Sequence, residues 1–486
     1  MSLYGGIELP GQPDLENIRR LDLMIIPQLN RMSRVGIAVD IPYLKELSVR
    51  FSAEMAELQK DISSYIPDYA LHQFTAVANA VEEEEGNGVY LNASSAEQIR
   101  VLLFDLLKVG RDQKLKTTAA GKVSSGKKNL SLVHDDHPVI PLIEKYREKA
   151  KLKQSYCDNM LLLAKFHPAG PDCPACGLTH VESTQRLHTQ WLTTRAITGR
   201  IQCKNPPLQT IPTRSKEGMK IRAAFYAGEG KKLISVDFSQ MELRDLAHLS
   251  ADPRMLHVYQ TDGDIHLTTA MNAFGINDPS HVDKYLHRLP AKTTNFSITN
   301  GTTEKGLHAQ LTSAFWAAGQ TPPPALDQDW CKSFIAKWHQ TYKGVQPYFD
   351  TQYYRARRYG YVWNPWGRVR YIPQVKSSLP WKIHEGLREA QNFSVTSSNA
   401  EQTKLAMAEC EELFTDFRAE GVHCEGLLSI HDQIIAEVDQ DYAETIGQLV
   451  VGVFENVMND RETGERRWRV PIRSDCEILD RWKPKE

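Results

Sequence analysis

The segment LISVDFSQMELR, residues 233–244, joins the end of an apolar strand to the start of a helix. The apolar run ends at Asp237, as expected for a strand that carries a carboxylate to its exposed tip. A second acid, Glu242, follows about one helical turn into the next element. Its role stays open at this point, because Ser239-x-x-Glu242 also has the spacing of a helix capping box.

A second segment, GLLSIHDQIIAEV at 426–438, places an acid in a comparable position. Two apolar runs flank His431-Asp432, which is typical of a tight hairpin turn. If both strands belong to one sheet, Asp237 and Asp432 converge. Two carboxylates on rigid backbone suit a pair of divalent cations about 3.5–4 Å apart, an arrangement that serves phosphoryl transfer. Mg²⁺ is the expected ion, since it binds through one or two carboxylates with phosphate oxygens and water. Either aspartate alone could equally be an ordinary turn residue.

The segment RLPAKTTNFSITNG, residues 288–301, carries four side chains at intervals of four: Arg288, Lys292, Phe296 and Asn300. On a helix these side chains form one stripe of about 18 Å. Cations at one end and an aromatic ring further along match a nucleoside triphosphate that lies lengthwise. The same spacing is also an ordinary amphipathic pattern, so the stripe alone decides nothing.

The bulk composition sets broad limits on the class of protein. With 486 residues, 41% of them hydrophobic, the sequence predicts a large protein with several lobes. No apolar run approaches the roughly 18 residues that cross a bilayer, and the first residues do not resemble a signal peptide. The eight cysteines form no disulfide framework. We therefore expect a soluble protein without membrane partners in a reducing compartment, either bacterial cytoplasm or nucleoid, a phage-infected host, or an organelle.

Net charge is −2, so the whole chain does not resemble a nucleic-acid binder, but residues 108–128 are locally basic. The cations of this basic segment are Lys108, Arg111, Lys114, Lys116, Lys122, Lys127 and Lys128. Interleaved with Gly, Ser and Thr, they predict a mobile loop that meets phosphates. A solvated loop without a partner is the alternative.

Helical and strand patterns alternate along the chain. Helical periodicity covers residues 14–65, 95–109, 138–165, 240–360, 382–416 and 441–457, and strand-like runs cover 186–203, 231–238, 360–373, 426–438 and 470–479. Strands that bracket a long helical insertion predict a discontinuous α+β domain.

One insertion, HPAGPDCPACGLTH at 167–180, has the composition of a metal site. It offers four ligands within fourteen residues: His167, Cys173, Cys176 and His180. Such a set could close a tetrahedral structural zinc site that pins a loop. Two reduced surface thiols would explain the pattern almost as well, since a single CxxC is half of a typical site.

Taken together, these segments resemble the family A DNA polymerases, the DNA polymerase I-like group. DFSQMELR resembles motif A, RLPAKTTNFSITNG motif B and HDQ motif C. Further similar segments are MSRVGIAVDIPYLKEL, TGRIQCKNPPLQTIPTR, DGDIHLTTA and RRYGYVWNPWGRVRYIP, all in family order. The resemblance implies an α+β right-hand fold with an antiparallel palm sheet and helical fingers and thumb. Its implied parts are an N-terminal palm-associated segment (1–40), thumb (41–190), palm with motif A (191–250), fingers (251–378) and palm with motif C (379–486).

The resemblance also implies roles for single residues. Asp237, Asp432 and the Phe238 carbonyl would bind two Mg²⁺ ions, and Glu242 would exclude a ribose 2′-OH. The nucleotide-binding residues would be Glu242, His266, Arg288, Lys292, Phe296 and Asn300, with Lys292 also catalytic. The DNA-binding residues would be Arg200, Gln209, Arg388, Asn392 and His431. The implied partners are primer-template DNA, dNTPs and accessory proteins of a replisome, and the chain is expected to be a monomer.

Several positions depart from the family pattern. Asn300 stands where the family usually has Tyr, and Gln433 where it has Glu. Pro207 and Thr396 replace Asn and Gln, both normally at the minor groove. Pro290 lies inside motif B, where it would occupy a first helical turn and leave Arg288 outside the regular stripe.

No strand with an Asp-x-Glu motif precedes the thumb, so we expect no 3′–5′ proofreading by this polypeptide. The first rival interpretation is a single-subunit RNA polymerase, which shares the palm but lacks the gate acid Glu242. The second is a catalytically inactive DNA-binding relative. The presence of Asp237, Asp432, Lys292 and Arg288 together argues against it.

Overall fold

The computed structural model describes residues 9, 11–74, 91–111, 113, 115–118, 120–177, 180, 182–212 and 215–482. It divides into two compact units. The first unit comprises residues 1–36, 190–204 and 229–480, and the second comprises 37–189, 205–228 and 481–486. Both units are discontinuous in sequence, as expected for the first from its bracketing strands. The five part boundaries implied by the resemblance remain a proposal.

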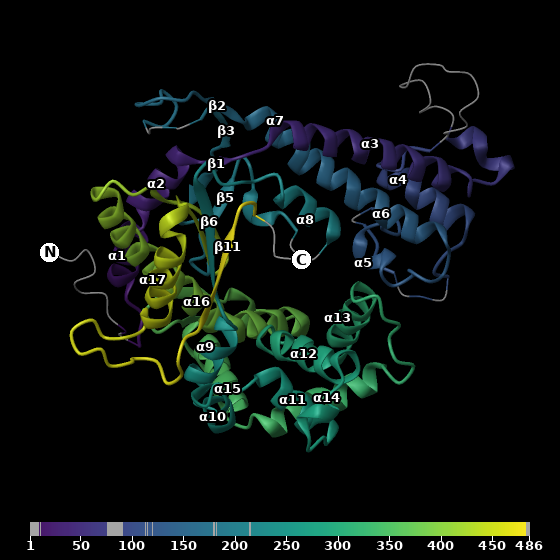
Figure 1. Ribbon diagram of the computed structural model, residues 1–486. Helices are drawn as coiled ribbons and strands as arrows, with labels where there is room; N and C mark the ends of the chain where they lie inside the picture. The colour runs from purple at the N-terminus through teal and green to yellow at the C-terminus, as the bar shows by residue number, and fades with distance from the viewer. Residues whose placement is uncertain are drawn as a thin grey trace. The chain divides into compact units, whose positions relative to one another are not determined.

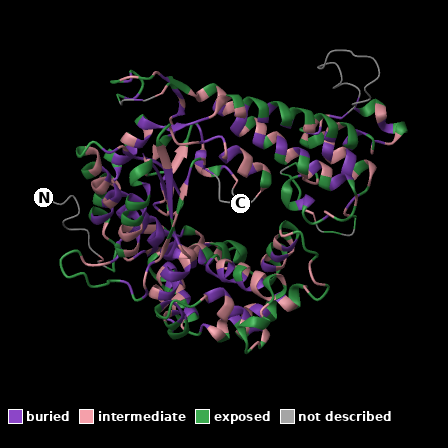
Figure 2. Ribbon diagram, in the orientation of Figure 1, coloured by how far each residue is buried: buried purple, intermediate pink, exposed green. Residues whose placement is uncertain are grey.

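An antiparallel four-stranded sheet, in the order β11-β6-β10-β9, forms the centre of the first unit (Figure 1). Its strands are β6 (Lys231–Phe238), β9 (Cys424–Ile430), β10 (Gln433–Asp439) and β11 (Ser474–Leu479). Helix α17 (Ala443–Asn456) packs on β6 and β11, whereas α2 (Ile26–Val35) contacts β9. Strand β6 is an interior strand, and its residues 233–236 are all buried, including Ser235 (Figure 2).

A run of helices separates β6 from β9 in the chain. These are α9 (Met241–Ser250), α10 (Pro253–Gln260), α11 (Ile265–Phe274), α12 (Leu289–Thr299), α13 (Glu304–Ala317), α14 (Gln328–Thr341), α15 (Val345–Tyr359) and α16 (Pro380–Ala419). A hairpin of β7 (Tyr361–Trp363) and β8 (Val369–Tyr371) precedes α16, as predicted from the sequence. The helices α10, α11, α13 and α14 begin at capping side chains, namely Asp252, Asp264, Thr303 and Asp327.

Helix α16 crosses the first unit and carries many buried polar residues. Its buried Glu401 pairs with Arg368 and with Lys404, whose Nζ lies 3.1 Å from Glu401 Oε2. Asp22, on helix α1 (Leu15–Met24), lies 2.7 Å from Arg368 and 2.6 Å from Lys404. Buried charges are tolerated when they are paired in this way, and the network fastens α1 to the unit's core.

The second unit is mainly helical and also contains a small sheet in the order β1-β3-β2. Its elements include α3 (Ile41–Ser63), α4 (Ala96–Arg100), α5 (Lys127–Leu130), α6 (Val139–Leu152), α7 (Asn159–Leu163), α8 (Lys216–Arg222), β1 (Ile37–Ala38), β2 (Lys165–His167) and β3 (Thr184–Leu187). The helices predicted at 95–109 and 138–165 both contain a π-helical stretch, at Val101–Leu106 and Lys153–Asp158. Among the described residues, no helix has the length and apolarity needed to cross a membrane.

Candidate active site

The sheet brings the two predicted metal-binding acids to one end of neighbouring strands. Asp237 is the penultimate residue of β6 and lies opposite Gln433, the first residue of β10. Asp432 immediately precedes Gln433 in the two-residue turn between β9 and β10. The Phe238 N–H donates to the Asp432 carbonyl oxygen at 3.3 Å, so backbone directly ties the two segments. We call Asp237 and Asp432 the acid pair.

The electrostatics of the acid pair favour a cation. Desolvation by the surrounding chain, followed by repulsion from Asp432 and Asp475, raises the pKa of Asp237 to about 7, although its side chain still reaches solvent. Desolvation also raises the pKa of Asp432, and Glu242 adds to that effect while Arg200 opposes it. Clustered carboxylates whose charged forms are disfavoured are what a bound divalent cation stabilises. The donor set therefore fits a hard divalent metal.

The strand register places a third acid beside Asp237, one that was not predicted from the sequence. Asp475 on β11 lies directly opposite Asp237, and Gln433 lies opposite it on the other side. Directly opposed residues of antiparallel strands point to the same face, so all three side chains share one face. Gln433 donates to the Ser235 hydroxyl at 2.7 Å. The sequence shows that Asp475 and Glu477 lie two residues apart and so share one face of a strand. It does not show that this strand, β11, pairs with β6.

Glu242 lies in the first turn of α9 and binds Arg200. The Arg200 Nη2 atom is 2.6 Å from Glu242 Oε1. The capping-box interpretation of Ser239-x-x-Glu242 is wrong, because the cap residue is Gln240 in a left-handed conformation and no side chain caps the helix. The Glu242 side chain is therefore not used as a helix cap. Its partner Arg200 also acts electrostatically on Asp432 of the acid pair.

A glycine sets the position of Arg200. Gly199 has a φ of +82°, and a Cβ there would lie 2.6 Å from the Arg368 Nε atom. Only glycine fits such a conformation so close to a packed guanidinium. The tight turn delivers Arg200 just before strand β5 (Gln202–Lys204), which pairs with β4 (Gln190–Leu192).

The proposed triphosphate stripe lies on α12 and its flanks, but it is not one continuous α-helix. Arg288 ends a π-helical turn and is the N-cap of α12, with Pro290 in the first turn as expected. Asn300 is the C-cap. Lys292 and Phe296 lie within the helix, with Lys292 exposed. Arg288 therefore lies just outside the regular helix, as expected from Pro290, and Asn300 lies just beyond its C-terminal end.

Neighbouring helix α11 contributes the remaining phosphate-directed groups. Asp264, its cap, holds the Arg288 guanidinium at 2.7 Å. His266 is 3% exposed, and its Nδ1 accepts a hydrogen bond from Asn295 Nδ2 at 2.9 Å. Burial lowers the pKa of His266 to about 4, so the ring is neutral near pH 7 and its other nitrogen is left to donate. The His266 and Phe296 rings lie 5.5 Å apart.

The end of α12 is joined to α16 by a chain of polar side chains. Asn392 Nδ2 donates to Asn300 Oδ1 at 2.8 Å, and Asn392 Oδ1 accepts from the Thr396 hydroxyl at 2.8 Å. Arg388 packs over Gly301, where an added Cβ would lie 2.6 Å from the Arg388 Cγ atom. Two residues that depart from the family pattern, Asn300 and Thr396, are thus linked through the predicted DNA-binding residue Asn392.

Three further sequence-predicted features are placed separately. His431 is exposed, with a φ of +59°, in the β9–β10 turn. Gln209 lies in a short 3₁₀ turn (Leu208–Thr210) of the second unit. The basic segment also belongs to that unit, where Asn129 bonds to the Lys116 backbone and to the Ser124 carbonyl, and Lys114 lies outside the described residues.

Comparison with known proteins assigns the family. The family model described as DNA polymerase family A matches residues 42–484. The chain therefore belongs to DNA polymerase family A, as the resemblance predicted.

Curated relatives and a solved structure agree with this assignment. The thermostable DNA polymerase I of Thermus thermophilus is 33% identical over 429 residues, covering 88% of this chain and 44% of that protein. The DNA polymerase I of Deinococcus radiodurans is 31% identical over 456 residues, covering 93% and 41%. The polymerase domain of Pol1 from M. smegmatis, solved with DNA primer-template and dNTP, matches with a TM-score of 0.76 at 25% identity, covering 96% of this chain and 72% of that one.

The chain thus spans less than half the length of these two curated relatives. The structural match confirms the predicted α+β right-hand fold with an antiparallel palm sheet and helical fingers and thumb.

Proposed function

We propose that this chain is a template-directed DNA polymerase that adds dNTPs to a primer 3′-OH by phosphoryl transfer assisted by two metal ions. The observation that carries the proposal is the register of β6 with β10, which brings Asp237 and the turn containing Asp432 to one end of the sheet. Family membership and the polymerase domain solved with primer-template DNA and dNTP support it.

The metal-binding residues of the proposal are the acid pair and the Phe238 carbonyl. Members of this family generally use divalent metal ions, and the oxygen-only donor set favours Mg²⁺. When bound, such ions activate the attacking hydroxyl and neutralise the leaving pyrophosphate. Asp237 lies on a paired strand and the Asp432 carbonyl accepts a hydrogen bond from the Phe238 N–H, so both acids would keep their positions without substrate.

The remaining roles follow from the contacts around α11 and α12. Arg288, oriented by Asp264, and the exposed Lys292 would bind the triphosphate, and Lys292 would also act on its developing charge. Neutral His266 would donate a hydrogen bond rather than supply charge. Phe296 would pack on the nucleotide sugar.

Glu242 would exclude the ribose 2′-OH. Its ion pair with Arg200 holds the carboxylate in one place, which a steric filter requires. Arg200 would in addition contact the primer-template minor groove, together with Gln209. His431 would lie near the primer terminus.

Asn300, Arg388 and Asn392 would contact the template side. The three side chains lie together at the α12–α16 junction, which supports a joint role. A misplaced template base would push on all of them at once. Asn300 offers an amide in place of the family's aromatic ring, so base stacking at this point would be replaced by hydrogen bonding.

The proposed partners are primer-template DNA, dNTPs and accessory replisome proteins, with the chain acting as a monomer. We also propose that this polypeptide does not proofread. Its N-terminal Asp14-Leu15-Glu16 begins a helix: Asp14 caps α1, and Glu16 pairs with Arg19 at 2.7 Å. A mismatched primer incubated with metal but without nucleotides should therefore keep its length, and shortening would contradict this expectation.

Primer extension tests the main proposal. Wild-type chain should extend a primed DNA template with dNTPs, and Asp432→Ala should lower the rate by about 10³-fold or more, since several kcal/mol of transition-state stabilisation is lost. Asp441→Ala, an exposed acid just beyond β10, is the matched control. Extension with NTPs alone would favour a single-subunit RNA polymerase, and DNA binding without any extension would favour an inactive relative.

A further inference from the structure

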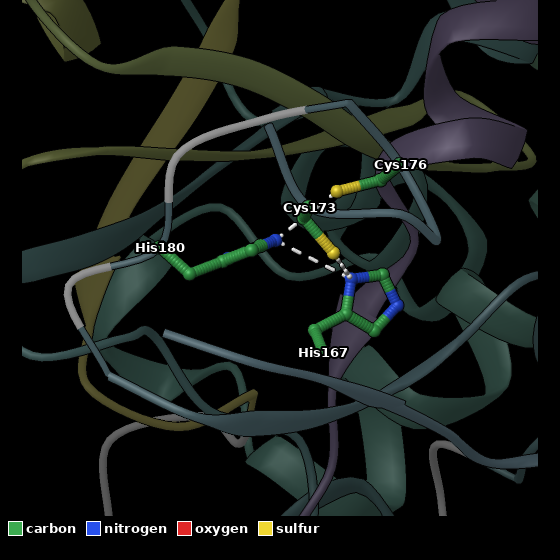
Figure 3. Close-up of side chains that lie close together, drawn as sticks. All are labelled: His167, Cys173, Cys176 and His180. Carbon is green, nitrogen blue, oxygen red and sulfur yellow. Dashed lines mark hydrogen bonds between the residues drawn. The ribbon is translucent and has the colours of Figure 1, made fainter. Parts of the chain in front are cut away.

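The loop between β2 and β3 gathers four potential metal ligands that the polymerase site does not use. His167 ends β2, and His180 returns on the other side of the loop through paired backbone hydrogen bonds with Gly170 of 2.8 and 3.0 Å. Between them, Cys173 and Cys176 lie in a tight turn in which the Gly177 N–H donates to the Cys173 carbonyl at 2.6 Å. Local backbone geometry therefore aims all four side chains inward (Figure 3).

The distances match a tetrahedral centre. The four ligand atoms lie within 4.8 Å of one another. His167 Nδ1 lies 3.4 Å from Cys173 Sγ and 3.3 Å from His180 Nε2, and Cys176 Sγ lies 3.1 Å from His180 Nε2. Zinc–sulfur and zinc–nitrogen bonds of about 2.3 and 2.0 Å at tetrahedral angles give ligand separations of about 3.3–3.8 Å. The cluster has nearly this size.

Burial separates this cluster from a chance group of surface side chains. His167, Cys173, Cys176 and His180 are 0%, 3%, 2% and 6% exposed. The two thiols are therefore buried, and not at the surface as the alternative interpretation expected. The sequence of this loop, residues 168–183, contains few large apolar side chains, and small segments of this kind commonly depend on a metal.

A fifth residue orients one ligand. His167 Nε2 lies 2.9 Å from His188 Nε2. If Nδ1 of His167 faces the cluster, its Nε2–H donates to His188, which fixes the tautomer and the ring orientation. Metal-binding histidines usually have such an outer partner.

We propose that His167, Cys173, Cys176 and His180 bind one structural Zn²⁺ ion, with His188 as a positioning residue. Two thiols lose their protons to solvent on binding, so two thiolates balance the charge of the ion and the buried site is neutral. All four positions are filled by protein, so the site leaves no open position for substrate and is structural. Its role is to hold the β2–β3 loop closed, and it does not depend on polymerase activity.

Metal analysis of the whole chain, purified under reducing conditions without chelator, tests the proposal. We expect one zinc per chain in the wild type and almost none in Cys173→Ser or Cys176→Ser. Cys203→Ser, a half-buried cysteine of the first unit, is the matched control and should keep its zinc. His188→Ala should bind zinc about 10–100-fold more weakly in a chelator competition.

Cobalt substitution of the wild type gives a readout that does not depend on how the variants fold. The strong visible absorption of tetrahedral Co²⁺ with thiolate ligands is the expected result. Wild-type chain that takes up neither zinc nor cobalt, Cys173→Ser with full zinc, or iron in place of zinc would each overturn the proposal.

Discussion

Asp237 has an acidic neighbour on one side, Asp475 of β11, and a neutral neighbour on the other, Gln433 of β10. This asymmetry makes the negative charge around the acid pair adjustable from either neighbour. One added or removed unit charge about 4 Å away changes the binding of a cation by about 1 kcal/mol when water screens it as fully as bulk solvent does, and by more at the lower dielectric of a protein surface.

Asp475→Asn should therefore raise the Mg²⁺ concentration for half-maximal primer extension about fivefold, and Gln433→Glu should lower it. A metal titration at fixed dNTP concentration measures both effects. Asp441→Asn should leave the titration unchanged. Equal midpoints for all variants would show that neither neighbour acts on the metals.

Glu242 is the residue on which sugar selection should depend. Glu242→Ala removes the carboxylate held by Arg200, so the preference for dNTP over NTP should fall by about 10²-fold, measured as the ratio of kcat/KM values. Glu444→Ala changes an exposed acid in the first turn of another helix, α17, and should preserve the preference. If the Glu242 variant discriminates as the wild type does, the gate lies elsewhere.

At the scale of elements, the junction of α9 and α16 contains a fully buried acid outside the proposed metal ligands. Asp245 is 0% exposed, and its Oδ1 accepts from Gln402 Nε2 at 3.0 Å. Burial raises the pKa of Asp245 well above its usual range, more than the Gln402 hydrogen bond lowers it. The native state therefore keeps this proton at pH values where the unfolded chain, with a pKa of about 3.9, has lost it.

Asp245 therefore lowers the free energy of unfolding as pH rises from about 4 toward its native pKa, at up to about 1.4 kcal/mol per pH unit. Asp245→Asn should remove this dependence, so its stabilising effect should grow between pH 5 and pH 8. Urea unfolding midpoints of both proteins across this range test the prediction. Parallel pH profiles would contradict it.

Elements were easier to predict from the sequence than the contacts between them. Long periodic helices such as α16 and α17, and strands with an apolar run such as β6, lie close to their predicted ranges because local pattern determines them. The role of Glu242 was harder, since a capping box and an ion pair with Arg200 have the same local sequence. Asp264 and Asp475 were missed because their partners, Arg288 and Asp237, are set by tertiary packing and strand register.

At the scale of the whole molecule, charge is unevenly distributed in a chain that is nearly neutral. Lys127 and Lys128, both exposed at α5, are the most tightly spaced cations of the basic segment. If they meet phosphates, the double variant Lys127→Ala/Lys128→Ala should bind primer-template DNA more weakly. The slope of the logarithm of the DNA-binding constant against the logarithm of salt concentration should become shallower by up to about 1.8, since two phosphate contacts of about 0.9 each are lost.

The control pair for this experiment is Lys145→Ala/Lys151→Ala, which removes the same charge from exposed positions of α6. Fluorescence anisotropy over a salt series gives both slopes. An identical change in the two double variants would mean that only net charge matters, and no change in either would remove the basic segment from the DNA-binding surface.

The position of β6 between β10 and β11 has a consequence for how the protein is made. A ribosome that adds about 5–20 residues per second needs roughly 10 to 40 s after Asp237 to reach Asp432. During that interval the nascent chain has its middle strand but neither strand that will pair with it. Both edges of β6 stay unpaired until residues 433–439 and 474–479 have been made, so this strand is open to non-native pairing during translation.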